Sequence, residues 1–291
     1  MLAGLQIRPW QEEDAARLAA GRPPGEAGDP ILAPSALRTP HGEVSAGQVW
    51  LRALAAVVDG EAVGGGAVWS SRWHPARLWA YVEVTPDRRR RGVGTALLAA
   101  LRRLAEPDGR PLRTKVRDHH PSGAFATAAG LRLVLIRSTS RELDPAGLAD
   151  PPARVVAADL GGAEVCDAFR RWYGAVHPTD PPGVLGDADI RDTHLGEAAG
   201  GVIVRHPSGS AAGIGLVFDD GSEWGFSGGG LDPVGPDAVD LARDLILGAA
   251  RLVPSGTRLV LEVDDSMADM AGAADLLGAS HGDTIHVVAE R

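Results

Sequence analysis

The chain has 291 residues, of which 44% are hydrophobic and 23% are charged, close to the average of soluble globular proteins. A formal net charge of -9 argues against a protein that binds nucleic acid through general attraction to phosphate. The single cysteine, Cys166, can form neither an internal disulfide nor a multi-thiolate zinc site, which favours a reducing cytoplasm. No segment reaches the roughly 18 apolar residues that a membrane span needs, so we expect a cytoplasmic protein without a membrane partner.

The first half is predicted to form a mixed, mostly antiparallel sheet flanked by helices. A short strand at 6–9, a helix within 10–20 and a loop rich in Gly and Pro at 21–40 come first. Two strands, 51–58 and 62–70, flank Asp59-Gly60, which is a strong hairpin signal. The remaining predicted elements are a strand at 77–84, a helix at 95–105, a strand at 112–116, a helix at 122–129 ended by Gly130, and a strand at 131–138.

The second half repeats this order in outline. It is predicted to hold strands at 155–158, 201–204, 211–218, 258–263 and 284–288, and helices at 163–173, 238–253 and 267–277. The segment 144–154 is rich in proline and looks like a linker. We therefore expect two tandem α/β (α+β) domains of one kind, 1–143 and 155–291.

The segment from Val84 to Leu98 joins an apolar strand to a helix through a turn with two glycines. Several consecutive backbone N–H groups at such a helix start point at one spot and can bind a phosphate or pyrophosphate. A Walker loop would need Gly-Lys-Ser/Thr after a longer span, and a dinucleotide-binding loop would need a third glycine where Leu97 stands. As an alternative, Arg88 to Arg91 could be a solvated charge run that opens a surface helix, but this leaves the glycines unexplained.

The pattern Arg89-x-x-Gly92-x-Gly94 resembles the signature of the GNAT acetyltransferase superfamily. It follows three predicted antiparallel strands, and Gly130-Leu131 downstream resembles the Gly-Phe pair of that family. The resemblance implies an acetyl-CoA site without a metal, with the pyrophosphate on the amides of 92–95 and the pantetheine arm along strand 77–84. The cofactor-binding residues that it implies are Val82, Val84, Arg89, Arg90, Arg91, Gly92, Val93, Gly94, Thr95 and His119.

Strand 77–84 is predicted to place Trp79, Tyr81 and Glu83 on one face. A primary amine with a pKa of about 10.4 must lose a proton before it attacks a thioester. Glu83 is the predicted base, directly or through water, because members of the family often use a carboxylate on this strand; it could instead be a solvent-facing carboxylate. Tyr81 could protonate the departing thiolate and Trp79 could line the acceptor pocket, or both could serve packing.

The sequence departs from the family where a tyrosine often serves as general acid, because Ala126 stands there and the adjacent Phe125 cannot donate a proton. Tyr81, a histidine of His119-His120 or solvent could supply the proton, or the thiolate could leave unaided because a thiol has a pKa of about 8.5. Asp118-His119-His120 lacks the further Asp and His clusters of a metal phosphoesterase. His41 and His74 are expected on the surface.

The second half is predicted to have lost the cofactor site. If Leu231-Asp232-Pro233 corresponds to Val84-Thr85-Pro86, no arginine follows it. Pro236 removes an amide donor, and Asp237 and Asp240 bring negative charge to the place of the pyrophosphate. A structural role is therefore expected for this half.

These features favour an acetyl-CoA-dependent N-acetyltransferase, monomeric or homodimeric, whose acceptor is a small-molecule amine. Acetylation of a protein amino terminus or lysine is one alternative, and a non-catalytic CoA-binding sensor or assembly module is another, which the absent tyrosine at Ala126 supports. The negative net charge would suit a cationic acceptor through electrostatic steering.

Overall fold

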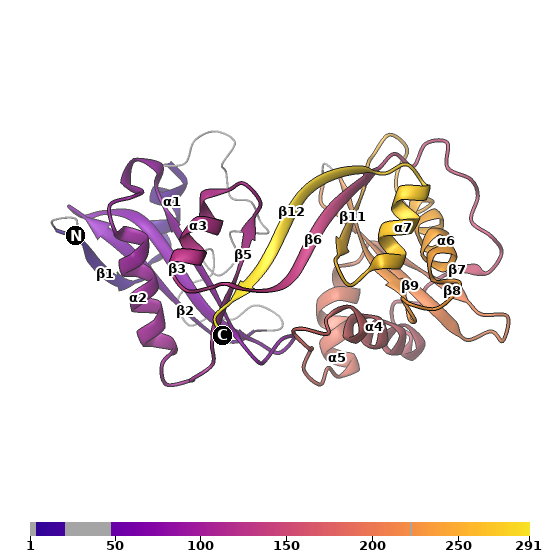
Figure 1. Cartoon of the computed structure of the whole chain (residues 1–291), viewed down its shortest axis with the longest axis horizontal. Helices are drawn as coiled ribbons and strands as arrows, with labels where there is room; N and C mark the ends of the chain where they lie inside the picture. The colour runs from indigo at the N-terminus through magenta and orange to yellow at the C-terminus, as the bar shows by residue number, and fades with distance from the viewer. Residues whose placement is uncertain (1–3, 21–47, 222) are drawn as a thin grey trace. The chain divides into compact units, whose positions relative to one another are not determined.

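The computed structural model describes residues 4–20, 48–221 and 223–291, and its contacts divide the chain into two compact units (Figure 1). The first unit comprises Met1–Leu135 with Val287–Arg291, and the second comprises Ile136–His286. These bounds differ from the expected ranges 1–143 and 155–291. Strand β6 (Leu133–Leu143) continues into the second unit, and strand β12 (Ser280–Ala289) ends in the first.

The sheet of the first unit follows the order β1-β2-β3-β4-β5-β12. Its strands are β1 (Gln6–Pro9), β2 (Gln48–Val58), β3 (Glu61–Ser71), β4 (Leu78–Val84), β5 (Leu112–Arg117) and the end of β12. The pairs β1–β2, β2–β3 and β3–β4 are antiparallel, whereas β4–β5 is parallel. The predicted hairpin between β2 and β3 is confirmed, and Asp59 and Gly60 both have the positive φ that a tight turn of this kind requires.

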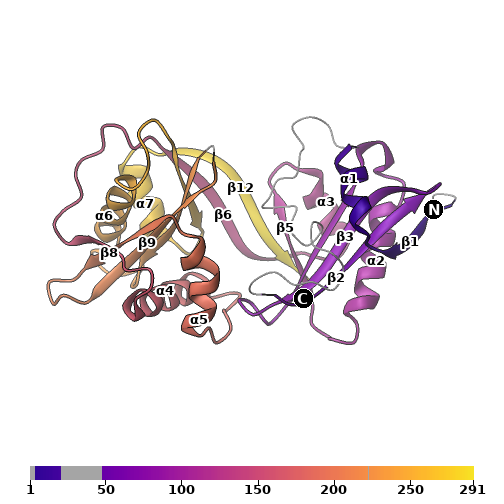
Figure 2. The same cartoon turned by 180° about the vertical axis from the view of Figure 1, so that it is seen from behind.

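Helices cover both faces of this sheet. Helix α2 (Val93–Ala105) and helix α3 (Pro121–Ala128) enclose one core, to which Leu97, Leu101 and Ala126 belong. Helix α1 (Glu12–Ala20) covers a second, smaller core around Trp10 and Leu18. Figures 1 and 2, seen from opposite sides, show α2 in front of the strands in the first view and α1 in front in the second.

Two glycines of β3 allow α2 to approach the sheet closely. A Cβ atom on Gly64 would lie 2.8 Å from the Glu83 carbonyl oxygen, and one on Gly66 would lie 2.9 Å from the Leu101 side chain. Side chains at these positions would push the helix outward. The glycines therefore help to hold the start of α2 beside the end of β4.

The last residues of the chain complete the first unit. The Glu290 amide donates to the Leu112 carbonyl at 2.9 Å, and the Glu290 carboxylate accepts from the Leu112 amide at 2.9 Å. The same carboxylate forms an ion pair with Arg102 of α2 at 2.6 Å. Val288 belongs to the core under α2. The carboxyl terminus thus ties β5 to α2.

The sheet of the second unit follows the order β12-β6-β11-β10-β9-β8-β7. Its other strands are β7 (Val155–Ala157), β8 (Gly200–Arg205), β9 (Ala211–Asp219), β10 (Trp224–Gly230) and β11 (Leu259–Asp264). The pair β10–β11 is parallel, as β4–β5 is in the first unit. Strand β10 was not predicted, because four of its seven residues are glycines that weaken the apolar signal of a strand.

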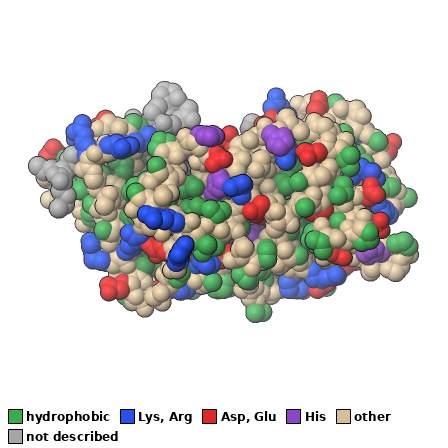
Figure 3. All heavy atoms as spheres, viewed as in Figure 1, with side chains coloured by type: hydrophobic (Ala, Val, Ile, Leu, Met, Phe, Trp, Pro, Cys, Tyr) green, Lys and Arg blue, Asp and Glu red, His purple; other side chains and the backbone are tan. Residues whose placement is uncertain are grey.

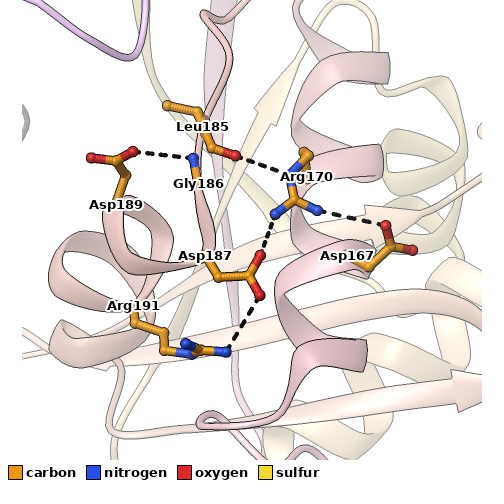
Figure 4. A network of polar contacts seen from close by, with 7 residues as sticks. All are labelled: Asp167, Arg170, Leu185, Gly186, Asp187, Asp189 and Arg191. Carbon is orange, nitrogen blue, oxygen red and sulfur yellow. Dashed lines mark hydrogen bonds and ion pairs between the residues drawn. The ribbon is translucent and has the colours of Figure 1, made fainter.

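The helices of the second unit are α4 (Ala163–Val176), α5 (Asp187–Ile190), α6 (Ala238–Ala250) and α7 (Ala268–Leu276). Helix α5 and the π-helical turn Arg191–Leu195 that continues it were not predicted either. Arg170 of α4 ties this region down through Asp167, Asp187 and the Leu185 carbonyl (Figure 4). The pair with Asp167 is local to α4, but the contacts with Asp187 and Leu185 are tertiary and leave no periodic pattern in the sequence.

The other predicted helices and strands are present within the described residues, with ends shifted by up to five positions. The expected loop at 21–40 and His41 lie outside those residues. Across the part of the chain that the structure describes, no helix is long and apolar enough to cross a membrane.

Candidate active site

Strand β4 presents different residues to the two faces of its sheet, as predicted. Val82 and Val84 pack against the core under α2, together with Phe125 of α3. Tyr81 packs against the opposite core, under α1. The alternation therefore separates Trp79, Tyr81 and Glu83 from the valines.

A turn of 3₁₀ helix at Pro86–Arg88 follows β4 and is anchored at both ends. The Thr85 amide donates to the Val63 carbonyl at 3.0 Å, and Arg89 Nε donates to the Val84 carbonyl at 3.0 Å. A hydrogen bond from Thr85, followed by the charge of Arg88, lowers the pKa of the Asp87 carboxyl. Arg89 thus holds the loop against the end of β4. The sequence predicted only a contact with pyrophosphate for this residue.

Helix α2 begins at Val93, two residues before the predicted start, with Gly92 as its N-cap. Gly92 has φ 85°, in the left-handed region that favours glycine, and no side chain caps the helix within the described structure. The first intrahelical bond runs from the Ala96 amide to the Gly92 carbonyl at 3.0 Å. The amides of Val93, Gly94 and Thr95 therefore precede the helical ladder, and amides in this position at a helix start are the kind of donor that binds anions.

The charge around this helix start is positive. Arg89, Arg90 and Arg91 are exposed, and Arg90 has φ 62°, so the chain turns through two left-handed residues before the helix. The dipole of a helix adds partial positive charge at its amino end. A Cβ at Gly94 would make ordinary van der Waals contacts, 3.5 Å from the Phe125 ring and 3.6 Å from Val84.

Strands β4 and β5 are paired only at their beginnings. The ladder joins Leu78 to Leu112 and Trp79 to Arg113, whereas the ladder from β4 to β3 continues to Val84. At the last β4–β5 pair, Arg113 Cζ lies 3.8 Å from the centre of the Trp79 ring. Trp69 of β3 stacks on Trp79 with ring centres 6.1 Å apart. Trp79 is therefore held on both sides at the point where the ladder ends.

Tyr81 and Glu83 form a hydrogen-bonded pair on β4. The Tyr81 hydroxyl donates to Glu83 Oε2 at 2.9 Å, and both side chains are half-buried. The sequence placed them on one face but did not predict this bond. The pair brings a carboxylate and a phenol together beside the end of β4, where a carboxylate can accept a proton and a phenol can relay or donate one.

The histidines near the site differ in their environments. His119 is exposed in the turn between β5 and α3, with φ 59°, and its predicted role stays untested. His120 Nδ1 accepts from the Ser122 amide at 3.2 Å and so caps α3. His74, expected on the surface, is buried with 6% of its area exposed, so that expectation is wrong. Within 4–20, 48–221 and 223–291, no three His, Cys, Asp or Glu side chains gather as a metal site would require.

In the second unit, strand β10 corresponds to β4, and the end of β10 is bonded to a carboxylate of the chain itself. The β10–β11 ladder ends at Phe226 while β10 continues to Gly230, whose amide donates to Asp269 Oδ2 at 3.3 Å. Asp269 lies in the first turn of α7 and is 2% exposed. Burial raises the pKa of the Asp269 carboxyl, and backbone hydrogen bonds from Met270 and Gly230 oppose that rise.

The model of the acetyltransferase (GNAT) family matches residues 27–130. No curated protein sequence matches significantly.

Among solved structures, a GCN5-related N-acetyltransferase from Sphaerobacter thermophilus has a TM-score of 0.68 at 16% identity, covering 100% of this chain and 96% of its own. A tandem GNAT protein from the clavulanic acid biosynthesis pathway has a TM-score of 0.64 at 18% identity, covering 98% of both chains. An acetyltransferase of the GNAT family from Colwellia psychrerythraea has a TM-score of 0.55 at 11% identity, covering 98% of this chain and 100% of its own.

Residues 27–130 therefore match the acetyltransferase (GNAT) family model, and the chain as a whole has a fold similar to that of a solved tandem GNAT protein.

Proposed function

We propose that the first unit transfers the acetyl group of acetyl-CoA to the primary amine of a small molecule. The observation that carries this proposal is the start of α2, where the amides of 93–95 precede the helical ladder beside three exposed arginines. A pyrophosphate is an anion of the size and charge that such a helix start binds.

The pantetheine arm is proposed to lie along β4. That strand leaves its ladder with β5 after Trp79 but stays paired with β3 as far as Val84. A strand edge outside a ladder offers backbone donors and acceptors to an extended ligand with amide groups. Val82 and Val84 lie beside this edge, so they are the side chains that we expect along the arm.

The reaction begins with an ammonium group, which must lose one proton before nitrogen can attack. Glu83 accepts that proton, directly or through a water molecule, and releases it to solvent. The amine nitrogen then bonds to the thioester carbonyl carbon. The C–S bond then breaks, and the nitrogen loses its second proton to solvent. The departing CoA thiolate gains a proton from Tyr81 or from solvent. Ala126 is buried in the core and has no donor group, so the proton for sulfur comes from elsewhere.

The hydrogen bond between Tyr81 and Glu83 supports a shared role for this pair. With the Tyr81 hydroxyl 2.9 Å from the Glu83 carboxylate, a proton taken up by Glu83 can be passed along the same contact. Because the thiol of CoA has a pKa near that of ordinary thiols, about 8.5, a weak acid suffices to protonate it.

The test is release of free CoA thiol from acetyl-CoA in the presence of a panel of amines. Glu83→Gln keeps the shape of the side chain and removes the base, so turnover should fall more at pH 7 than at pH 9.5, where more amine is already neutral. Tyr81→Phe, which keeps the ring but removes the hydroxyl, is the matched variant for the proton relay. Equal loss of turnover at both pH values in Glu83→Gln would remove Glu83 from the role of base.

Binding of CoA is measured separately by calorimetry. Arg89→Glu should abolish it, because this change reverses a charge at the anion site and removes the bond to the Val84 carbonyl. Binding of CoA without thiol release on any amine would instead favour the non-catalytic sensor that the absent general acid at Ala126 suggests. If the unaltered chain does not bind CoA, the proposed function fails as a whole.

A further inference from the structure

The carboxylate of Glu290 is shared between two elements of the first unit. Its Oε2 atom accepts from the Leu112 amide of β5 at 2.9 Å. Its Oε1 atom accepts from Arg102 of α2, from Nε at 3.0 Å and from Nη2 at 2.6 Å. The Glu290 amide in turn donates to the Leu112 carbonyl at 2.9 Å. Both carboxylate oxygens are therefore engaged, one by β5 and the other by α2.

Arg102 extends this connection to α3. Its Nη2 atom also donates to the carbonyl of Ala129, the C-cap of that helix, at 2.5 Å. A single carboxylate thus holds β5 and α2 directly and the end of α3 through Arg102. All three elements contribute to the core under α2, to which Val288 also belongs.

Leu112 lies where the opening between β4 and β5 begins. The ladder of these strands consists of the pairs Leu78–Leu112 and Trp79–Arg113, and β4 runs on past it while still paired with β3. Glu290 therefore fixes β5 at the base of the opening along which the pantetheine arm is proposed to lie.

Arg102 lies near the opposite end of α2 from the proposed anion site. With a rise of about 1.5 Å per residue, it is roughly 14 Å from Val93 along the helix axis. Between these ends the helix packs closely on Gly64 and Gly66 of β3. A tilt of about 10° over that length would move the helix start by about 2 Å relative to β4. The contact with Glu290 limits such a tilt.

Ion pairs are common on the surface of this protein and do not indicate a function by themselves. Figure 3 shows basic and acidic side chains spread over the face that it draws, and most exposed pairs contribute little to stability. The Glu290 carboxylate differs because it bonds a strand amide and a helix side chain at once and is only 25% exposed. Fixing two elements relative to each other matters most where one ligand must contact both.

We propose that Glu290 is a positioning residue of the CoA site. By joining β5 to α2, it sets the distance between the helix start that binds the pyrophosphate and the opening that takes the pantetheine arm. This inference rests on the proposed function and adds a residue from outside the loop and β4. Strand β12 begins in the second unit, where Thr284 Oγ1 lies 3.1 Å from Thr139 Oγ1 of β6. The second unit thus contributes to the cofactor site through the strand that leads to Glu290.

The experiment measures the dissociation constant of CoA by calorimetry in the full chain. Glu290→Ala removes both contacts of the carboxylate and should raise this constant about tenfold, because a ligand held at two places loses affinity when their spacing is no longer fixed. Glu290→Gln keeps an acceptor for the Leu112 amide and should give a smaller rise. Arg102→Gln breaks the same contact from the other side. The double variant of Arg102→Gln and Glu290→Gln should bind CoA no worse than the weaker of the two single variants, since both changes remove one interaction.

Arg8→Ala is the control for a loss of stability alone. Arg8 forms an ion pair of similar length, 2.7 Å, with the buried Asp14 of α1 in the same unit. Its removal leaves that carboxylate without its cation, so it should destabilise the unit in denaturant titration while CoA affinity stays unchanged. Glu106→Ala, which removes an exposed carboxylate at the end of α2, is the control for charge. In the thiol-release assay, Glu290→Ala should raise the KM for acetyl-CoA and leave the KM for the amine unchanged.

The outcomes separate this inference from the proposed function. Unchanged CoA affinity in Glu290→Ala, or a loss no larger than that of Arg8→Ala or Glu106→Ala, overturns the positioning role and leaves the proposed function standing. The same criteria apply to Glu290→Gln and Arg102→Gln, which decide the matter if Glu290→Ala does not fold. If the unaltered chain does not bind CoA, the proposed function fails, and the positioning role fails with it.

Discussion

Replacing each glycine of the loop by alanine tests the start of α2 most directly. Gly92 has φ 85°, and a Cβ there would meet nothing within 4 Å, so the only cost of Gly92→Ala is backbone strain. An L-residue in the left-handed region costs about 1–2 kcal/mol. At Gly94, which lies inside the helix, a Cβ would make ordinary contacts at 3.5 Å and 3.6 Å.

The strain at position 92 must appear in one of two measurements. If the loop keeps its conformation, the first unit is destabilised by the whole strain and CoA affinity stays unchanged. If the loop relaxes in the free protein, less stability is lost, but CoA must restore the strained form, and its dissociation constant rises. A strain of 1–2 kcal/mol corresponds to a rise of roughly 5- to 30-fold. The two losses together should therefore total at least about 1 kcal/mol.

Gly94→Ala should show neither loss. Alanine is favoured over glycine within a helix by up to about 1 kcal/mol, so the midpoint of thermal unfolding should stay or rise. The assay combines calorimetric unfolding with titration of CoA into each variant. The reasoning is refuted if Gly92→Ala changes neither quantity, or if Gly94→Ala abolishes binding while Gly92→Ala does not.

Three further predictions concern stability. Glu290→Ala should destabilise the first unit by about 1–2 kcal/mol in denaturant titration, because the Leu112 amide and Arg102 both lose their partner, whereas Glu290→Gln should cost less. Burial lowers the pKa of His194 to about 4, so the unfolded chain binds a proton that the folded chain excludes, and stability is lost as pH falls from about 6.5 toward 4. His194→Phe, which keeps a ring beside Phe169 and Tyr173, should remove up to about 3 kcal/mol of this pH dependence, and an unchanged slope would contradict the assignment. Asp269→Asn, which keeps an acceptor for the Gly230 amide, should preserve the second unit, whereas Asp269→Leu should lower its unfolding free energy by about 1–3 kcal/mol.

Local patterns in the sequence predicted the elements that position the site. Asp59-Gly60 identified the hairpin, Gly130 the end of α3, and alternation the two faces of β4, because each signal depends on the backbone preferences of a few adjacent residues. Gly92 is informative for the same reason, since the left-handed conformation just before the helix favours glycine.

Contacts between distant residues were not predictable in this way. Glu290 lies 178 residues from Leu112, and nothing in either segment alone indicates that the last strand completes the first unit. The bond between Tyr81 and Glu83 depends on rotamers, which alternation does not fix.

The two units share an order of elements, and they differ in the charge at the helix that follows the fourth strand of the repeat. In the first unit, Gly92 precedes α2 without a capping side chain among the described residues, and arginines surround it. In the second unit, the N-cap of α6 is Asp237, whose side chain makes no capping bond within the described structure but brings negative charge to that helix start, and the Asp269 carboxylate accepts from the Gly230 amide at the preceding strand end. A carboxylate of the chain satisfies a backbone donor permanently, whereas an open helix start leaves its amides to water or to a ligand anion. The second unit thus has an acidic helix start and a strand end bonded to its own carboxylate, whereas the first has exposed arginines beside the amides of 93–95, and this difference is the physical reason for which we propose catalysis in the first unit.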